Sequence, residues 1–225
     1  MAKRPNPSKV IDAVARELLQ RFECPLPFHA VGTKSLGSLA LLDLSMTPMR
    51  AVERLWGGEL PVFDSTADAN ELIGTLVMGL WNQLAEHQSR FAPFRLPRIE
   101  APVTREGVAI LLLMRDQEIW HFCLGLVGTD PDPKFPDRTM RTIAVLSRVR
   151  DMCVRTRELA EDLDKDLSME DCAGLIQQFR QVTKVAEHEI HEAVLSCTKA
   201  GRNLMQKKRR RAGRCFIEHP DRLTR

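Results

Sequence analysis

Residues that start and stop helices constrain the fold of this chain more than any other feature. Thr47 can cap a helix because its hydroxyl accepts a hydrogen bond from an otherwise unpaired backbone N–H, and Pro48 sits at the first helical position, where its missing donor costs nothing. Gly57–Gly58 then ends the helix, since glycine adopts the left-handed conformation without a steric penalty. Ser65 with Asp68 starts the next helix. These residues predict two helices joined by a short linker.

Apolar residues recur at helical spacing on both of these helices, which predicts that one face of each is buried. The first helix carries Val52 and Leu55 on that face. The second carries Leu72, Ile73, Leu76, Val77, Leu80, Trp81 and Leu84. We expect the two helices to pack side by side, with Trp56, Leu76 and Trp81 in one hydrophobic core.

The rest of the chain predicts an all-α fold, a multi-helix bundle of about seven helices with a basic C-terminal extension. Periodicity alone allows residues 108–114 to be a helix or a short strand, and the continuation through Trp120 favours a helix. Proline-rich stretches at 24–33, 90–103 and 128–136 predict breaks. The other predicted helices begin at Ser8 and cover about 36–44, 137–164 and 168–199.

The last two helices are predicted to form an antiparallel hairpin, because only a short connector separates them. Ser168 with Asp171 caps the second of them. Its apolar face repeats at a period of 3.6 residues, as expected for packing on a neighbouring helix. That face consists of Leu175, Ile176, Phe179, Val182, Ala186, Ile190, Ala193, Val194 and Cys197.

Charge is distributed unevenly along the 225 residues. The net charge is +3, but residues 199–225 alone carry +8, so the preceding residues sum to −5. This asymmetry indicates an acidic body with a basic tail. We divide the chain into a flexible N-terminus (1–7), a helical domain (8–200) and a basic C-terminal tail (201–225).

Cysteines and apolar runs bear on the compartment. Six cysteines occur singly, without a CxxC pair, and the N-terminus has no apolar signal core, which favours free thiols in a reducing cytoplasm. The longest strong apolar run, residues 108–114, is far shorter than the roughly 20 residues that span a bilayer. We expect a cytoplasmic protein with no membrane segment.

Motifs for nucleotide binding or hydrolysis are absent, since the chain has no GxGxxG, no GxxxxGKS/T and no GxSxG. Gly74, Gly79 and Gly125 instead fit close packing between helices. His121 and Cys123 resemble a nucleophile pair, but near-adjacent residues on a helix point in different directions. The sequence predicts no catalytic residue and no cofactor, and it favours a non-enzyme.

Acidic and imidazole side chains gather at Glu187, His188, Glu189, His191 and Glu192. Imidazole and carboxylate together can bind a transition metal, and His188 neighbours His191 on a helix. However, the spacing is neither the HExxH of zinc proteases nor the Glu-x-x-His of ferritin-like proteins. The favoured interpretation is a solvated polar face, and a metal site at His188 and His191 is the alternative.

Six cations near the C-terminus give the strongest chemical signal of the chain. Like charges in a row repel one another, which favours an extended or frayed segment when they are unpaired. Opposite a polyanion they release counterions and gain affinity. RNA, DNA, an acidic protein and an anionic membrane all fit, as does a merely solubilising tail. The six are Lys207, Lys208, Arg209, Arg210, Arg211 and Arg214.

Three sequence blocks stand in order within residues 35–130: TPMRAVERLWGGELPVFDS, LIGTLVMGLWNQLAEH, and FAPF followed by IWHFCLGLVG. Together they resemble the YecA/YgfB-like family of bacterial proteins. The resemblance implies an all-helical domain and no known reaction. The matching motif positions are Trp56, Gly57, Asn82, Phe94, Trp120 and Gly125.

Many members of that family end in a small zinc-binding tail that begins with Gly-Arg-Asn, similar to the tail of the translocation motor SecA. Here Gly201, Arg202 and Asn203 are present, but residues 204–207 contain no cysteine. Cys215 and His219 remain as possible ligands, whereas structural zinc takes four Cys or His ligands. The resemblance therefore implies a degenerate tail without zinc.

These features favour a non-enzymatic binding or adaptor protein. Its helical body would present a groove to a protein, and its tail would engage an acidic partner such as RNA or the ribosome. The alternative is a metal-binding protein or metal-dependent enzyme that uses His188 and His191. The sequence does not fix an oligomeric state.

Overall fold

Helices build the whole described part of the computed structural model, which confirms the predicted all-α bundle. The structure describes residues 7–42, 46–128, 130, 133–162, 164 and 167–217, without the side chains of 7–9 and 208–217. Seven helical rods and no strand occur within these ranges.

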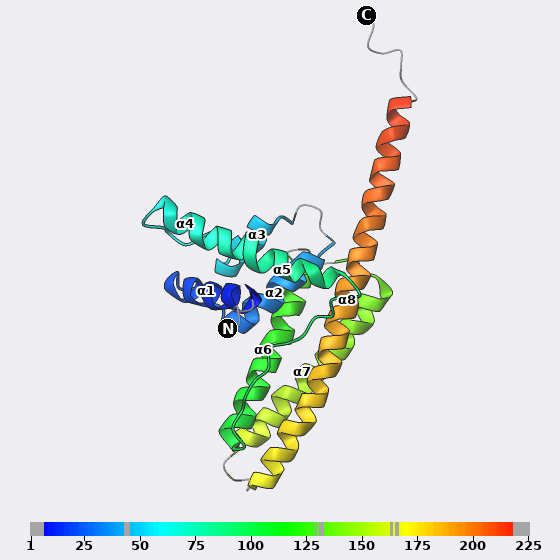
Figure 1. Cartoon of the computed structure of the whole chain (residues 1–225). Coiled ribbons are helices and arrows are strands. Elements are labelled where there is room, and N and C mark those ends of the chain that lie inside the picture. The colour runs from blue at the N-terminus through cyan, green and yellow to red at the C-terminus, as the bar shows by residue number, and fades with distance from the viewer. Residues whose placement is uncertain are drawn as a thin grey trace, which may run out of the picture.

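The N-terminal half forms a lobe on one side of the molecule (Figure 1). It contains three separate helices and one long rod in which four segments follow one another without a break. The separate helices are α1 (Pro7–Arg21), α2 (Phe28–Ala40) and α3 (Pro48–Glu53), the last extended by η1 (Arg54–Trp56). The rod consists of α4 (Thr66–Ile73), η2 (Gly74–Trp81), α5 (Asn82–Ala85) and η3 (Glu86–Gln88).

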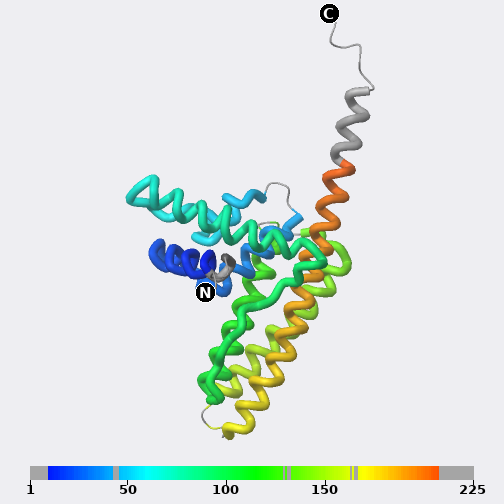
Figure 2. Tube along the Cα trace, in the orientation of Figure 1, coloured from blue at the N-terminus to red at the C-terminus, as the bar shows by residue number. Residues whose placement is uncertain are grey.

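Three long helices form the C-terminal half: α6 (Arg105–Val127), α7 (Asp137–Glu161) and α8 (Met169–Ile217). They run alternately up and down, so α7 and α8 make the predicted antiparallel hairpin (Figure 1). Residues 108–114 are helical, which confirms the alternative that the sequence favoured. The connector from η3 to α6, residues 89–104, runs along the outside of this unit (Figure 2), and we call it the strap.

The predicted caps hold the helix starts in place. The Thr47 hydroxyl accepts from the Arg50 N–H at 3.2 Å, and the Ser65 hydroxyl accepts from the Asp68 N–H at 3.2 Å. Gly57 adopts φ 88°, a left-handed conformation that ends η1. The Ser168 hydroxyl likewise accepts from the Asp171 N–H at 3.1 Å. These interactions confirm the sequence-based boundaries at the four sites.

Close approach of α2 and α6 defines the centre of the molecule. A Cβ atom at Gly125 would lie 2.1 Å from the Lys34 carbonyl oxygen, and one at Gly37 would lie 2.2 Å from the Phe122 carbonyl oxygen. Only glycine fits such contacts between backbones. The packing role predicted for Gly125 is therefore confirmed, whereas the one predicted for Gly74 is wrong, because a Cβ there would meet nothing within 4 Å.

Burial follows the predicted apolar faces in most places. Leu76 is buried and Trp56 packs against the same core, as predicted. Trp81 is half-buried and does not belong to that core, so the prediction is wrong for Trp81. The α8 stripe is buried at Ile176, Phe179, Ala186, Ile190, Ala193, Val194 and Cys197, with Leu175 and Val182 half-buried.

Three helix boundaries differ from the predicted ones, one of them the end of α2, which lies at Ala40 and not near residue 44. Helix α2 begins at Phe28 rather than near residue 36, because Pro25 and Pro27 precede its first turn and the internal Gly32 is tolerated. Helix α8 continues to Ile217, well past residue 199. In addition, η2 is a π-helix, an uncommon geometry that often occurs at functional sites.

Candidate functional site

The end of α8 leaves the bundle and projects as a single helix (Figure 1). We call its residues 202–217 the basic arm. All residues from Arg202 to Lys207 are exposed, Leu204 by 42% and Met205 by 44%. Of the predicted polyanion-binding residues, Lys207 is thus accessible. The other five have a helical backbone, and their side chains lie outside the described part: Lys208, Arg209, Arg210, Arg211 and Arg214.

The helical backbone of the arm contradicts the expectation of an extended segment. Lys, Arg, Gln, Leu and Met are good helix formers, and an arm that continues an existing helix avoids the cost of nucleation. Repulsion between neighbouring like charges on a helix amounts to only about 0.2–0.5 kcal/mol per pair in water. Helix propensity therefore outweighs charge repulsion here.

Two pockets flank the base of the arm. One, of about 440 Å³, lies between α8 and the end of α2, where residues 39–42 and Met205 line it. The other, of about 420 Å³, lies between α8 and the strap, where Phe91 lines it and is 98% exposed. The Thr198 hydroxyl borders both pockets and has no hydrogen-bond partner in the described part of the chain. This region offers apolar contact area beside the basic arm.

The strap is tied to α8 by polar contacts. The Leu96 N–H donates to Glu187 Oε1 at 3.1 Å, and Arg95 Nη1 donates to Glu187 Oε2 at 2.9 Å. The Phe94 N–H contacts His191 Nδ1 at 3.5 Å. Burial lowers the pKa of His191 from its usual value, so the ring stays neutral and can accept this bond. Glu187 and His191 therefore act as anchors for the strap.

The side chains of the acid–imidazole cluster, residues 187–192, therefore lie in three different environments. Glu187 and His191 are buried under the strap, so the prediction of a solvated face is wrong for them. Glu189 binds Arg138 and Thr142 on α7. His188 is exposed. The structure does not bring His188 and His191 into one ligand set, and no three His, Cys, Asp or Glu side chains of the described residues form a metal-binding group.

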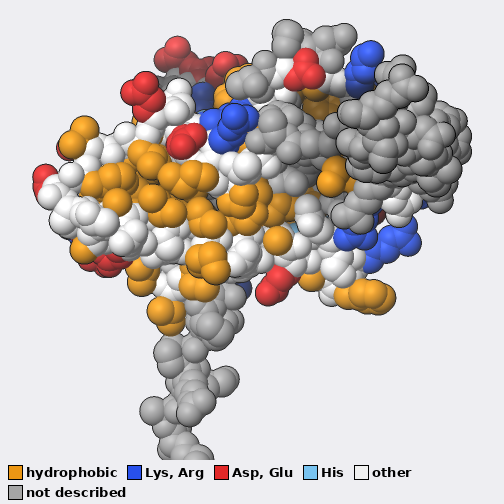
Figure 3. Space-filling model, turned by 90° about the horizontal axis from the view of Figure 1, so that it is seen from above, with side chains coloured by type: hydrophobic (Ala, Val, Ile, Leu, Met, Phe, Trp, Pro, Cys, Tyr) orange, Lys and Arg blue, Asp and Glu red, His pale blue; other side chains and the backbone are white. Residues whose placement is uncertain are grey.

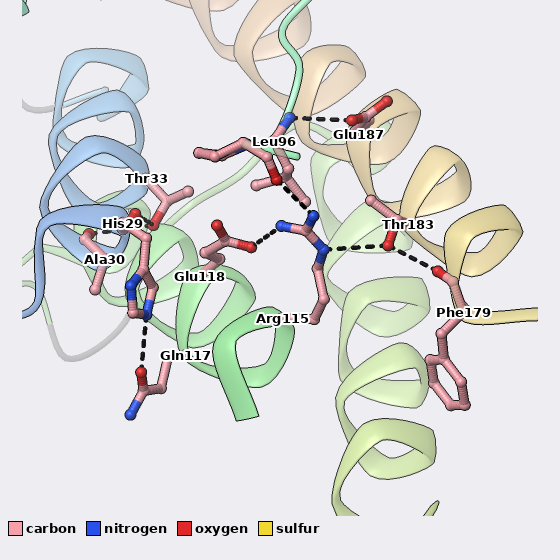
Figure 4. A network of polar contacts seen from close by, with 11 residues as sticks. His29, Ala30, Thr33, Leu96, Arg115, Gln117, Glu118, Phe179, Thr183 and Glu187 are labelled. Carbon is pink, nitrogen blue, oxygen red and sulfur yellow. Dashed lines mark hydrogen bonds and ion pairs between the residues drawn. The ribbon is translucent and has the colours of Figure 1, made fainter. Parts of the chain in front are cut away.

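A buried polar network lies in the centre of the C-terminal half (Figure 4). Arg115 on α6 donates to Glu118 one turn later, to the Pro97 carbonyl of the strap and to the Thr183 hydroxyl of α8. The Arg115 side chain is 6% exposed and the Glu118 side chain 0%. The network thus joins the strap, α6 and α8 through one guanidinium group.

Burial dominates the electrostatics of Glu118. It raises the pKa of this carboxyl to about 7, although the Arg115 charge opposes the rise. Glu118 Oε1 also lacks a hydrogen-bond partner in the described part. This pair was not predicted from the sequence. Opposite charges at i and i+3 of one helix can pair, but the polar run 115–118 does not show which of its side chains are buried.

The six family-motif positions do not meet in one site. Trp56 Nε1 donates to the Phe22 carbonyl at 2.8 Å, and Asn82 Nδ2 donates to the Met78 carbonyl at 3.1 Å on an exposed surface. Phe94 belongs to the strap and is buried. Together with Gly57 and Gly125, described above, these positions support turns and packing.

Trp120 is the motif tryptophan with the larger exposure, since 43% of it is accessible while Trp56 is half-buried. The Arg150 guanidinium of α7 lies 4.3 Å from its ring centroid, a cation–π contact, and Arg150 also binds Asp116 at 2.8 Å. This tryptophan covers the junction of α6 and α7.

The cysteines carry no nucleophilic site in the described part. Cys24, Cys123, Cys153, Cys172 and Cys197 are free thiols, as predicted. Burial raises the pKa of Cys123 to about 11 and that of Cys153 to about 12, so both remain thiols at neutral pH. The rejection of a His121–Cys123 pair agrees with this environment.

The fold and these local sites define an all-α protein with a helical arm. Comparison of the chain with known proteins identifies no relative. The chain matches no family model, no curated protein and no solved structure. The YecA/YgfB-like resemblance therefore remains an expectation from the motifs. No helix in the described ranges is both long and apolar enough to cross a membrane.

Proposed function

We propose that this protein is a non-enzymatic cytoplasmic adaptor whose basic arm binds RNA. One observation carries the proposal: α8 continues past the bundle as a helix, and the residues at the start of this arm are exposed. Six Lys and Arg residues follow within positions 207–214. A projecting helix can approach a polyanion without a clash from the bundle. The bundle would then be the part of the adaptor that binds a protein.

The composition of the arm favours RNA over other polyanions. Four of its six cations in positions 207–214 are arginines. Guanidinium groups bind phosphates in a bidentate manner and stack on unpaired bases, which folded RNA displays in loops and bulges. Lysine lacks this planar geometry. Contacts of this kind bind phosphate strongly and read base sequence weakly.

Fluorescence anisotropy with a labelled stem–loop RNA tests the proposal. If about six phosphate contacts form, affinity should fall by a factor on the order of 10³ between about 50 and 200 mM salt. Replacing the six arm cations by glutamine should abolish binding. A control variant replaces three exposed arginines of α7 by glutamine: Arg141, Arg148 and Arg155. Its RNA affinity should stay close to that of the unaltered chain.

Other outcomes would reject this function. Equal binding by a chain truncated after Asn203 would place RNA recognition on the bundle. Binding of anionic vesicles or an acidic peptide in preference to RNA would assign the arm to a different partner. Loss of binding in the α7 control alone would move the site to α7.

A further inference from the structure

Residues 55–89 form an acidic surface on the N-terminal lobe. This stretch contains five acidic residues and no Lys or Arg. Asp68 and Glu71 pair with Arg21 of α1. Glu59 and Asp64 are exposed and form no ion pair with another described residue. The described residues therefore compensate the negative charge on this surface only in part.

An apolar face accompanies this charge. On η2, Met78 is 71% exposed, and Ile73, Val77 and Trp81 around it are half-buried. Figure 3 views the molecule from the side toward which the basic arm projects, and it shows a band of hydrophobic side chains with acidic side chains at several points of its border. We call this face, residues 59–85, the acidic face. An uncovered apolar band of this kind marks an interaction site.

The basic arm has complementary properties. Leu204 and Met205 follow Ala193 and Val194 by three full helical turns, so they continue the stripe that α8 buries inside the bundle. On the arm, Leu204 is 42% and Met205 44% exposed, and the neighbouring Arg202 and Lys207 are exposed as well. The described start of the arm is therefore basic and amphipathic with apolar area open to solvent, a type of helix that docks in apolar grooves.

We infer that the acidic face receives the basic arm of a second copy of this chain. The two elements have similar lengths, since residues 202–217 span roughly 24 Å and residues 66–85 roughly 30 Å at 1.5 Å per residue. The arm projects beyond the lobe on the side that Figure 3 views (Figures 1 and 3). Because the arm runs across the direction of the α4–α5 rod (Figure 1), a two-fold axis inclined between these two directions would lay each arm along the other copy's acidic face.

This arrangement makes the contact twice. A stable interface buries about 1,600 Å² in total, so each arm-on-face contact needs to supply only about half of that area. Opposite charges meet in both contacts, which favours this pairing over one between two basic arms. The dimer does not depend on RNA binding, although RNA and the second copy of the chain would compete for the arm.

Sedimentation velocity at about 50 mM salt should give twice the chain mass of 25.6 kDa. Met78→Lys should yield a monomer, since it places a positive charge in the apolar band, at an exposed position, opposite the cations of the arm. Met169→Lys is the matched control: Met169 is 70% exposed at the start of α8, away from the arm, and the variant should remain dimeric. A monomeric unaltered chain, a dimeric Met78→Lys or a monomeric Met169→Lys would each overturn the inference.

Zero-length carbodiimide coupling identifies the contact. In a mixture of ¹⁴N- and ¹⁵N-labelled chains, Lys207 or Lys208 of one isotope should couple to Glu59 or Asp64 of the other. Coupling confined to one isotope would contradict the exchange. Met78→Lys should bind RNA at least as tightly as the unaltered chain, because the arm is no longer held by a second copy. Failure of the dimer and failure of RNA binding are therefore separable.

Discussion

Single glycines determine how closely the two central helices pack. Gly125→Ala places a methyl group against the Lys34 carbonyl, and α2 must move away from α6. We expect a loss of roughly 3 kcal/mol or more in the free energy of unfolding, at the upper end for overpacking. Denaturant titration measures it.

Gly174→Ala serves as the control for that substitution. Gly174 lies in α8, where a Cβ would meet nothing within 4 Å. Because alanine has the higher helix propensity, this variant should gain about 0.5–1 kcal/mol. Equal effects of the two substitutions would contradict the close approach of α2 and α6.

Glu118 should make stability depend on pH. Its pKa is raised from 4.5 to about 7 in the folded state, so folding favours the protonated form. The stabilisation is fully present below the unfolded pKa and is lost as pH rises through 7, on the order of 3 kcal/mol in all. Urea unfolding from pH 4.5 to 8 should show this loss, and Glu118→Gln should flatten it. Parallel pH profiles of the two proteins would refute the assignment.

At the scale of elements, the arm of α8 should add helix without adding stability to the bundle. Truncation after Asn203 removes residues whose described side chains are exposed. We expect a weaker far-UV helical signal and a free energy of unfolding changed by at most a few tenths of a kcal/mol, as for exposed positions generally. The measurement belongs at about 0.5 M salt, where association through charges is screened.

Ile190→Ala provides the contrast within the same helix. Ile190 is 0% exposed in the bundle, and its truncation should cost roughly 2–5 kcal/mol. A comparable loss on removal of the arm would show that the arm packs on its own bundle.

Local chemistry explains which elements could be predicted from the sequence. The caps at Thr47, Ser65 and Ser168 depend only on neighbouring residues, so the sequence predicts them. The apolar stripe of α8 is predictable as well, because it repeats at a regular period. The start of α2 was not, because prolines that precede a first turn resemble prolines that break a helix. The helical arm was missed because helix propensity and charge repulsion oppose each other, and their balance is not visible in a charge count.

The candidate sites were harder to predict than the helices, since distant segments form them. Glu187 meets Arg95 and Leu96 across 92 and 91 residues of sequence. No local sequence pattern indicates that pairing, so the sequence alone predicts that the acidic and imidazole side chains face solvent. The tail cations were identified from sequence, whereas the acidic face depends on how the rod and its linker lie in space.

On the scale of the whole molecule, we expect no stoichiometric zinc in the purified protein. Cys215 and His219 supply two of the four ligands that a structural site needs, and their side chains lie outside the described part. His188 is exposed while His191 faces the strap. Elemental analysis should find well under one zinc per chain. One tightly bound zinc that disappears in Cys215→Ala would disprove this expectation.

The strap also sets the order in which the chain assembles. Helices α6, α7 and α8 follow one another and pack as neighbours, so they close short loops and can form early. The contact of Glu187 with Leu96 joins α8 to the strap across 91 residues of sequence. It can form only once α8 has docked, so the strap closes after the helices it lies on. In hydrogen exchange it should open before the three helices that it fastens.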